Sequence, residues 1–316
     1  MTIKVGVIGL GAIGERVLNK FLQNSLTDVV AVCDVSDERL NSIKEKFNIP
    51  NTYKDYNEML QDESISLVYL AVPPKYHHRI ALDVIAAKKH LLCEKPLANS
   101  IEEAKEMAEA AEDAKIVNAI NFPMPYSNVF QRFKEKITNG EIGKVNRVEV
   151  QMHFTTWPRS WQQNDWIASR EQGGFIREVG PHYIQMVQEV FGELKNINTF
   201  VDYPENPALC EKGFISRMEL EDGTTVLFNG LSGIGQKEHI SFKVYGDKGT
   251  VEITNWSVLS VSEGEDAPTV YPLQRAEEVE LVSELVKAIN GENAQLVTFN
   301  DGLKVQNVLE QLLGNA

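Results

Sequence analysis

The sequence has few cysteines and no long apolar run. Cys33, Cys93 and Cys210 are odd in number and far apart, which argues against a disulfide framework and against a cysteine metal site. Cys33 and Cys93 stand at the ends of apolar runs that are typical of buried strands, so we interpret them as small core residues. This usage favours a reducing compartment, and we expect a cytoplasmic protein without a bound metal.

Positive charge is also scarce. The chain of 316 residues has 31 Lys and Arg against 45 Asp and Glu, a formal net charge of −14. Nucleic acids and anionic membranes both select basic surfaces, so we expect neither as a partner. No apolar stretch is long enough to span a bilayer, and the first residues lack the layout of a signal peptide.

The most informative motif of the sequence lies within its first residues. A β-branched run over 3–8 ends in a glycine-rich turn, and helical spacing of apolar residues follows. Strand, glycine turn and helix form the context in which G-x-G-x-x-G binds a dinucleotide. The alternative is a glycine turn that holds no ligand. The candidate cofactor residues here are Gly9, Gly11, Ala12, Ile13 and Gly14.

Asp34 closes the next apolar strand. A carboxylate at this position can accept hydrogen bonds from ribose hydroxyls and repels a 2′-phosphate, which favours NAD over NADP. No arginine occupies the next four positions, although Arg39 follows them. In the alternative interpretation, Ser36 or Asp37 caps the next helix and Asp34 is only solvated.

Strands and helices alternate as far as Asn121. Apolar strands are expected over 67–72, 90–93 and 115–120, and helices over 37–47, 55–61, 76–87 and 101–114. This alternation predicts a parallel sheet covered on both faces, and therefore a doubly wound Rossmann domain over 1–121. Ligands bind beyond the carboxyl ends of such strands. The candidate residues at these ends are Val72, Pro73, Glu94, Lys95 and Asn121.

Period-two alternation dominates the rest of the chain. Strands are expected over 147–154, 197–201, 214–220, 224–229, 240–245 and 249–253, and helices over 126–138, 175–191, 276–290 and 301–313. This pattern predicts an α+β domain over 122–316 with a large, mostly antiparallel sheet. An exposed sheet face commonly needs a cover, so we expect a homodimer or homotetramer that forms through this sheet.

Two groups of side chains could carry chemistry. Lys95, at a strand end between a glutamate and a proline, could reach a substrate, or it could be an ordinary surface lysine. If one helix runs through Glu178, this carboxylate lies one turn from His182 and can orient the imidazole for proton transfer with a hydroxyl. The alternative is a helix start with a satisfied histidine, where Pro181 breaks the pairing.

Three of the four tryptophans lie between 157 and 166. Aromatic faces beside arginine suit a sugar-like or polyol ligand, which makes Trp157, Arg159 and Trp161 candidate substrate residues. The alternative is a tryptophan-rich core or a dimer contact.

Together these motifs resemble the glucose–fructose oxidoreductase, inositol dehydrogenase and MocA (Gfo/Idh/MocA) oxidoreductases. The resemblance covers nearly the whole chain and includes His77, the run 93–98, the run 139–143 and the late hairpin 245–250. It implies NAD(P)-dependent hydride transfer at a hydroxyl of a sugar, polyol or cyclitol. It also implies that Lys95 contacts the reacting oxygen, that His182 is the acid/base, and that His77 belongs with the cofactor residues.

The chain departs from that family at several positions. Glu178 stands where an aspartate is usual, and Gln185 where a second aspartate is frequent. No arginine follows Asn121 in the run 122–125, so a contact to a substrate anion is missing or has moved to Arg159 or Arg177. These departures favour a divergent substrate. Two alternatives stay open: a dinucleotide-dependent sensor, and an enzyme that uses NAD as a transient oxidant for elimination or glycoside cleavage.

Overall fold

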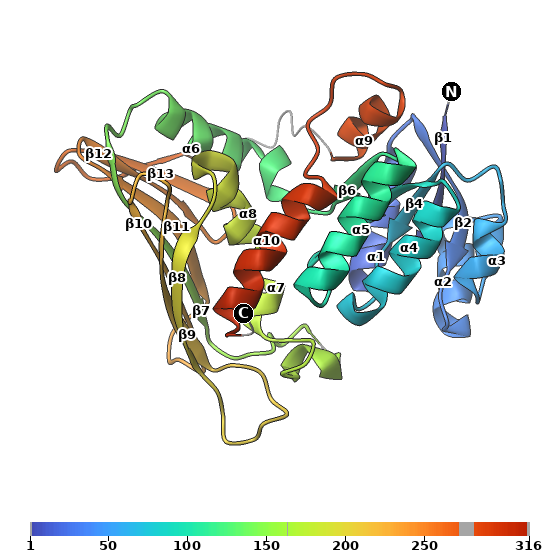
Figure 1. The fold of residues 1–316 in the computed structure, drawn as a ribbon, viewed down its shortest axis with the longest axis horizontal. Coiled ribbons are helices and arrows are strands. Elements are labelled where there is room, and N and C mark those ends of the chain that lie inside the picture. The colour runs from blue at the N-terminus through green and yellow to red at the C-terminus, as the bar shows by residue number, and fades with distance from the viewer. Residues whose placement is uncertain (1, 163, 272–280, 315–316) are drawn as a thin grey trace. The chain divides into compact units, whose positions relative to one another are not determined.

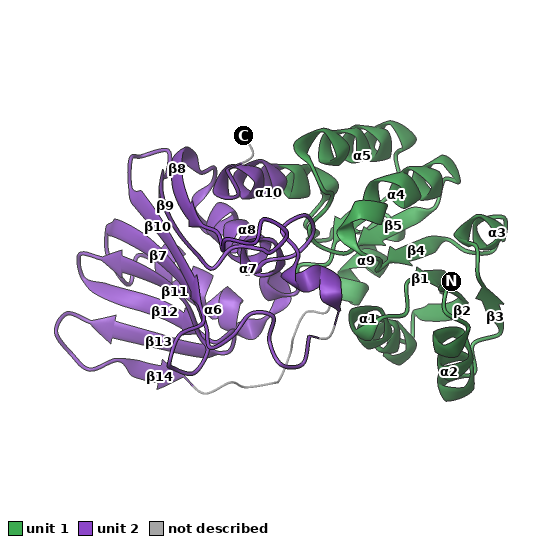
Figure 2. Cartoon of the chain, turned by 90° about the horizontal axis from the view of Figure 1, so that it is seen from below, with its two compact units in different colours: residues 1–122, 279–303 green, residues 123–278, 304–316 purple. Residues whose placement is uncertain are grey.

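The chain divides into two compact units. The computed structural model describes residues 2–162, 164–271 and 281–314 (Figure 1). Unit 1 comprises Met1–Phe122 and Val279–Leu303, and unit 2 comprises Pro123–Glu278 and Lys304–Ala316 (Figure 2). Residues 279–303 thus group with the N-terminal segment, whereas the sequence analysis assigned everything after Asn121 to one domain.

Unit 1 is built on a six-stranded parallel sheet. Its strands are β1 (Ile3–Ile8), β2 (Thr27–Cys33), β3 (Asn51–Tyr53), β4 (Leu67–Leu70), β5 (His90–Cys93) and β6 (Asn118–Ile120). They pair in the order β3-β2-β1-β4-β5-β6, and every pair is parallel. This order is that of the doubly wound dinucleotide-binding fold, which confirms the predicted fold class.

The helices of unit 1 are amphipathic and bury one side each. They are α1 (Ala12–Gln23), α2 (Asp37–Phe47), α3 (Tyr56–Leu60), α4 (His77–Ala86), α5 (Ile101–Ala114) and α9 (Leu281–Ile289). The apolar core joins β1 and β2 to Val282, Leu285 and Val286 of α9, so the returning chain completes this core. Of the helix predicted over 276–290, residues 276–280 lie outside the described residues.

Unit 2 is built on an eight-stranded sheet. Its strands are β7 (Val145–Phe154), β8 (Lys195–Asp202), β9 (Gly213–Glu219), β10 (Thr225–Ser232), β11 (His239–Gly246), β12 (Gly249–Thr254), β13 (Val258–Glu263) and β14 (Thr269–Tyr271). They pair in the order β14-β13-β12-β11-β7-β10-β9-β8. The pair β7–β10 is parallel and the others are antiparallel, which confirms a mostly antiparallel sheet.

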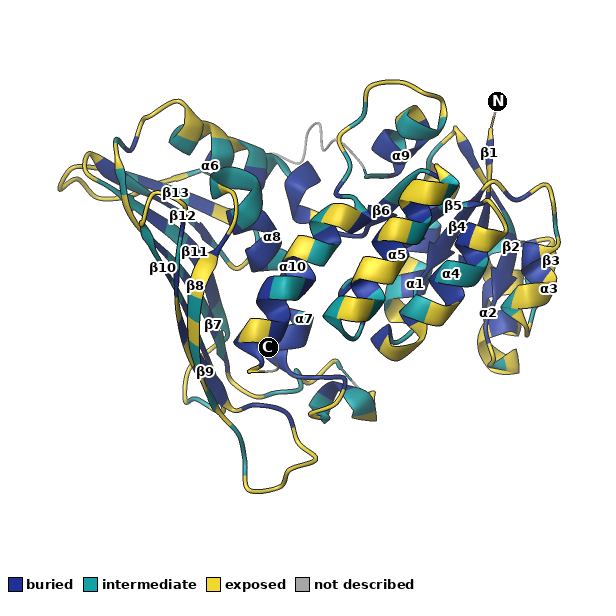
Figure 3. Ribbon diagram, viewed as in Figure 1, coloured by how far each residue is buried: buried dark blue, intermediate teal, exposed yellow. Residues whose placement is uncertain are grey.

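One face of this sheet is covered by helices of the same unit. Phe133 of α6 (Asn128–Thr138) and Tyr183 of α8 (Gly180–Phe191) both meet Phe242 of β11, with ring centroids 4.6 and 6.5 Å apart. Buried residues alternate with exposed or half-buried ones along β9 and β10 (Figure 3). Because successive side chains of a strand point to opposite faces, the exposed and half-buried set lies on the other side of the sheet. We call this opposite side the open face.

Several boundaries differ from those predicted. The strands β3, β13 and β14 were missed, because each is short or polar. The single helix predicted over 175–191 is wrong: α7 (Phe175–Glu178) ends before α8 begins, and Val179 lies between them with φ −113°. Pro181 stands in the first turn of α8, where its missing N–H is tolerated. The last helix, α10 (Phe299–Leu312), starts in unit 1 and continues in unit 2.

Candidate functional site

The glycine turn after β1 contains two glycines that the protein itself requires. Gly9 has φ +94°, and a Cβ there would lie 2.3 Å from the carbonyl oxygen of Ala71. A Cβ on Gly14 would lie 2.1 Å from the carbonyl oxygen of Gly9. Gly11 is different, because it has φ −67° and a Cβ there would meet nothing within 4 Å. Packing therefore explains Gly9 and Gly14 but does not explain Gly11.

The start of α1 fits an anionic ligand. Gly11 is its N-cap residue and supplies no side-chain cap, and the first helical hydrogen bond runs from Glu15 N to Gly11 O. The amides of Ala12, Ile13 and Gly14 thus precede the first intrahelical bond, where the helix dipole favours negative charge. With open space at Gly11, this arrangement fits the pyrophosphate of a dinucleotide.

Asp34 connects the end of β2 to the glycine turn. Its Oδ2 accepts a hydrogen bond from Leu10 N at 2.8 Å, and its Oδ1 accepts one from Ser36 N at 2.9 Å. Asp34 is buried, and Arg39 Nη1 lies 3.5 Å from Oδ2. Ser36, whose Oγ accepts from Arg39 N, caps α2. Asp34 is therefore held beside the turn and is not simply a solvated residue.

A buried polar network fixes the ends of β4, β5 and β6. Glu94 Oε1 accepts hydrogen bonds from Tyr69 Oη at 2.6 Å and from the side-chain amide of Asn121. Glu94 Oε2 accepts from Lys95 N at 3.3 Å. Burial and the neighbouring Glu94 carboxylate raise the pKa of Tyr69, so its hydroxyl stays a donor. This network sets the backbone from which the half-buried Lys95 side chain extends.

His77 ties two of these strand ends together. Its imidazole is fully buried, with Nδ1 2.9 Å from Pro96 O and Nε2 2.8 Å from Val72 O. Burial lowers the pKa of His77. With no accessible surface, the imidazole can assist cofactor binding only by positioning the loops that contain Val72-Pro73 and Lys95-Pro96.

In unit 2, Gly173 and Gly174 precede α7 in a crowded turn. A Cβ on Gly173 would lie 2.1 Å from Ile167 O, and one on Gly174, where φ is +95°, would lie 2.2 Å from Glu211 Oε2. Glu211 is buried, and its Oε1 accepts from Ile176 N at 2.7 Å. Burial raises the pKa of Glu211. Sequence reasoning missed this residue, since no local pattern marks a glutamate that caps a helix from a distant segment.

Glu178 and His182 lie on either side of the break between α7 and α8. Glu178 is the last residue of α7, and His182 N donates to Val179 O at 3.2 Å. Both residues are half-buried. The imidazole of His182 meets the indole of Trp256 edge to face, with ring centroids 5.5 Å apart and planes at 87°. Trp256 is the tryptophan outside the 157–166 cluster, and sequence reasoning did not select it.

The predicted aromatic segment surrounds a fixed arginine. Arg159 forms a two-point ion pair with Glu238, at 2.7 and 3.0 Å, and its guanidinium lies 4.9 Å from the ring centroid of Phe154. The same guanidinium lies 5.3 and 5.9 Å from the indoles of Trp157 and Trp161. Trp157 Nε1 donates to Ile167 O, whereas Trp161 is 64% exposed. The structure therefore brings these three predicted substrate residues together.

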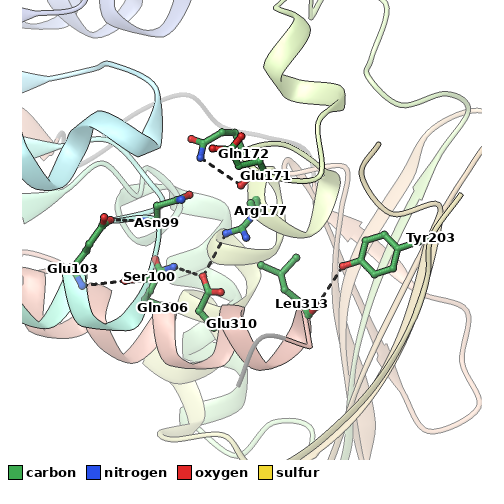
Figure 4. Close-up of polar contacts among 10 residues, drawn as sticks. All are labelled: Asn99, Ser100, Glu103, Glu171, Gln172, Arg177, Tyr203, Gln306, Glu310 and Leu313. Atoms are coloured by element: carbon green, nitrogen blue, oxygen red, sulfur yellow. Dashed lines mark hydrogen bonds and ion pairs between the residues drawn. The ribbon is translucent and has the colours of Figure 1, made fainter. Parts of the chain in front are cut away.

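Arg177 and Gln185 occupy buried positions. Arg177 forms an ion pair with Glu310 of α10 at 3.4 Å, and Gln306 Nε2 donates to the same carboxylate at 2.8 Å (Figure 4). Gln185 Nε2 donates to Glu189 Oε2 at 2.7 Å. Gln185 Oε1 is buried and has no hydrogen-bond partner among residues 2–162, 164–271 and 281–314. Lys95 belongs to unit 1, whereas Glu178, His182 and these residues belong to unit 2.

Two kinds of feature are absent from the described part of the chain. No group of three or more His, Cys, Asp and Glu side chains there could hold a metal ion. No described helix is both long and apolar enough to cross a membrane.

The fold and the glycine turn define the class: a two-unit α/β protein whose first unit is a Rossmann fold of the dinucleotide-binding type. Family models agree with this class. The model described as an oxidoreductase family with an NAD-binding Rossmann fold matches residues 3–122. The model described as the C-terminal alpha/beta domain of the oxidoreductase family matches residues 134–313. The chain belongs to the GFO/IDH/MocA family of oxidoreductases.

Individual relatives are distant. The chain is 28% identical to myo-inositol 2-dehydrogenase of Thermotoga maritima over 191 residues, which cover 60% of this chain and 55% of that protein. This match thus spans about half of that relative. The chain is 24% identical to the uncharacterized oxidoreductase YrbE of Bacillus subtilis, over 96% of this chain and 91% of that protein. A solved structure of levoglucosan dehydrogenase in complex with NADH has a TM-score of 0.85 at 20% identity, covering 100% of this chain and 97% of that one, which shows a shared fold.

Proposed function

We propose that this protein is an NAD-dependent dehydrogenase or reductase that acts on a hydroxyl or carbonyl group of a sugar, polyol or cyclitol. The observation that carries the proposal is the open space at Gly11. This glycine is the N-cap of α1, and no side chain caps the helix there. Lys95 and His182 supply the two polar groups that such a reaction needs. The names of two relatives, a myo-inositol dehydrogenase and a levoglucosan dehydrogenase, support the substrate class.

In this proposal each side chain has a defined task. Bound NAD supplies the hydride acceptor for oxidation of a carbinol carbon. His182 takes the hydroxyl proton, and Glu178 orients the imidazole and stabilises its charged form. Lys95 donates a hydrogen bond to the same oxygen as negative charge develops on it. In reduction, His182 returns the proton.

Substrate recognition is proposed for the aromatic segment and for Gln185. Trp157 and Trp161 offer apolar ring faces, and the Arg159 guanidinium, which lies near both indoles, is held by Glu238. The buried Gln185 Oε1 is an acceptor suited to a substrate hydroxyl. Arg177 is buried and forms an ion pair with Glu310.

The choice of NAD over NADP is proposed for Asp34. The carboxylate is fixed by two backbone donors, and a carboxylate at this position would repel a 2′-phosphate. Arg39, half-exposed beside it, pairs with this carboxylate. Asp34→Asn keeps the shape and removes the charge, so we expect the ratio of NADH to NADPH affinity to fall. An unchanged ratio in fluorescence titrations would contradict this role.

The catalytic assignment is tested with His182→Asn and Lys95→Ala. We would screen NAD with myo-inositol, levoglucosan and a panel of sugars for NADH formation. Loss of a general acid/base group lowers turnover about 10²- to 10⁴-fold, and we expect this range for His182→Asn. NADH binding should be retained in both variants. The matched controls are His78→Asn and Lys105→Ala, whose side chains lie in surface ion pairs of α4 and α5.

The same screen separates the open alternatives. Stabilisation by ligands without any turnover would favour a dinucleotide-dependent sensor. Product formation without net NADH would favour transient oxidation followed by elimination or glycoside cleavage. Wild-type turnover in both variants would overturn the assignment of Lys95 and His182.

We also propose that the open face of unit 2 pairs with another copy in a homodimer or homotetramer. Phe200 and Ile215 are cross-strand partners and are 77% and 61% exposed, with Leu231 exposed on β10. The same face carries both signs of charge in the pairs Arg147–Glu149, Arg217–Glu219 and Lys243–Glu252, so two copies need not repel each other.

Light scattering tests this pairing. The double variant Phe200→Glu with Ile215→Glu should elute as a monomer, because four carboxylates would be buried in a twofold contact. Leu26→Glu, at an exposed apolar position of unit 1, is the matched control and should leave the mass unchanged. A wild-type protein that is already monomeric would contradict the proposal.

A further inference from the structure

Trp256 occupies a backbone position that disfavours a large side chain. It lies in the turn Thr254–Ser257 between β12 and β13, which is closed by a hydrogen bond from Ser257 N to Thr254 O at 3.2 Å. Asn255 and Trp256 have φ +47° and +70°. Turns with two such residues strongly favour Asn-Gly, and a bulky residue at positive φ is an outlier. The sequence has Asn-Trp where the backbone alone would select Asn-Gly.

The indole is supported on one side by the core of unit 2. Its ring centroid lies 5.0 Å from that of Tyr183, which is fully buried and in turn meets Phe242 of β11 edge to face. Trp256 itself is half-buried. A well-packed tyrosine therefore fixes the place of the indole relative to α8.

On another side the indole contacts the imidazole of His182, as described above. The terminal torsion of a histidine side chain has broad minima, so neighbouring groups decide where the ring nitrogens point. The break between α7 and α8 places Glu178 on a different helix from His182. A second group that restricts the imidazole is therefore expected if this ring transfers protons.

We propose that Trp256 is a positioning residue that holds the His182 imidazole in its reactive orientation. The proposal rests on the proposed function of His182. Unfavourable backbone conformations persist where the surrounding structure and function require the side chain. Here the required group is the indole, because a glycine would relax the turn and remove the ring contact.

The test compares three variants of the same turn. Trp256→Gly creates the Asn-Gly pair that the turn prefers and deletes the ring. Trp256→Phe retains an aromatic ring. Asn255→Gly is the matched control: it relaxes the neighbouring positive φ and removes the Oδ1 acceptor of Ile240 N, but it leaves the indole in place. Thermal unfolding reports whether each variant folds. Turnover is measured with NAD and myo-inositol or levoglucosan, whichever gives NADH with the wild type.

We expect Trp256→Gly to lower kcat about tenfold or more at nearly constant KM, because misplacing a catalytic group by about 1 Å can reduce the rate 10²-fold. Its pH–rate profile should shift relative to the wild type. Trp256→Phe should recover most of the loss, and Asn255→Gly should retain wild-type kcat. An unchanged kcat in Trp256→Gly, or a rise in KM alone, would overturn the positioning role.

A second readout does not depend on turnover. In protein with isotope-labelled histidine, the ring resonances of His182 are assigned by their loss in His182→Asn. Removal of the indole should change their shifts in Trp256→Gly but leave them unchanged in Asn255→Gly. Unchanged His182 resonances in Trp256→Gly overturn the proposal. Wild-type activity in His182→Asn, by contrast, would contradict the proposed function of His182. The contact between His182 and Trp256 could still be measured in protein that keeps both residues.

Discussion

The chain has two glycine-containing turns that lead into helices. One leaves the helix start open to a ligand, and the other fills it with a side chain of the protein. Before α1, Gly9 and Gly14 are crowded by backbone, but Gly11 faces open space and the helix has no side-chain cap. Before α7, both Gly173 and Gly174 are crowded, and the carboxylate of Glu211 accepts a hydrogen bond from Ile176 N. The start of α1 is open to an external anion, whereas the start of α7 is already occupied by a carboxyl group of the chain.

The difference shows that glycines alone do not identify a ligand site. The two turns differ in what surrounds the position of a missing Cβ. At Gly11 that position has no protein atom nearby, whereas at Gly174 it lies against Glu211. In unit 2 this space is filled, so Gly173 and Gly174 shape the backbone that leads to Glu178 and His182. Three substitutions can break or sharpen this comparison.

The largest effect is expected for Gly174→Ala. The backbone there has φ +95° and ψ +153°, a region that only glycine occupies without strain of about 1–3 kcal/mol. The new methyl would also collide with Glu211, and such crowding costs about 1–3 kcal/mol. We therefore expect urea unfolding to show a loss of roughly 3 kcal/mol or more.

Gly233→Ala is the control for this substitution. Its φ is +77°, but a Cβ there would meet nothing within 4 Å. We expect a loss of only about 1 kcal/mol, from backbone strain alone. Equal losses in the two variants would mean that Glu211 does not crowd the turn.

An intermediate effect is expected for Gly11→Ala, and it concerns binding. The methyl group meets no protein atom, so the free energy of unfolding should change by less than about 0.5 kcal/mol. The same methyl would crowd a bound pyrophosphate by about 1–3 kcal/mol, which corresponds to about 5- to 150-fold weaker NADH binding. Fluorescence titration measures the affinity.

The control is Gly235→Ala, another glycine with open space around it and no positive φ. This variant should bind NADH like the wild type. If Gly11→Ala also retained full affinity, the turn before α1 would hold no dinucleotide phosphate at that residue.

The smallest effect is a pH dependence that originates at Glu211. Burial raises the pKa of this carboxyl above its ordinary value of 4.5, so the folded protein binds the proton more readily than the unfolded chain. The stabilisation from this proton is complete below pH 4.5 and is lost as the pH rises through the raised pKa. The stability of the wild type relative to Glu211→Gln should therefore fall as the pH increases.

Urea unfolding of both proteins at several values of pH measures that difference. Since other titrating groups are common to the two proteins, they cancel in the comparison. If the stability of the wild type relative to Glu211→Gln rose with pH, the prediction would be contradicted. The start of α7 would then favour the ionised form of Glu211.

The sequence predicts features that depend on neighbours in the chain. The glycine turn, Asp34 and the parallel sheet follow from local patterns, and the strand ends bring Glu94 near Asn121 once the strand order is known. Pro181 is a further local signal, because proline is favoured in the first turn of a helix. It agrees with the alternative of a break near His182 and not with one helix over 175–191.

Glu211 and Trp256 could not be predicted in the same way. Glu211 reaches Ile176 across 35 positions, and nothing in the sequence around either residue indicates the contact. Trp256 stands in a turn whose backbone disfavours it, so local propensity points away from the observed conformation. Both residues became visible only through tertiary packing, and both contact the elements that carry Glu178 and His182.

The return of the chain to unit 1 has a consequence for how this protein is made. Val282, Leu285 and Val286 complete the core of the Rossmann unit, and Ile120 N donates to Val297 O beyond β6. A ribosome must therefore synthesise the chain through Val297 before the nucleotide-binding half can finish folding. A fragment that ends at residue 122 would lack the core residues of α9. We therefore do not expect residues 1–122 to fold as an independent domain that could be exchanged between proteins.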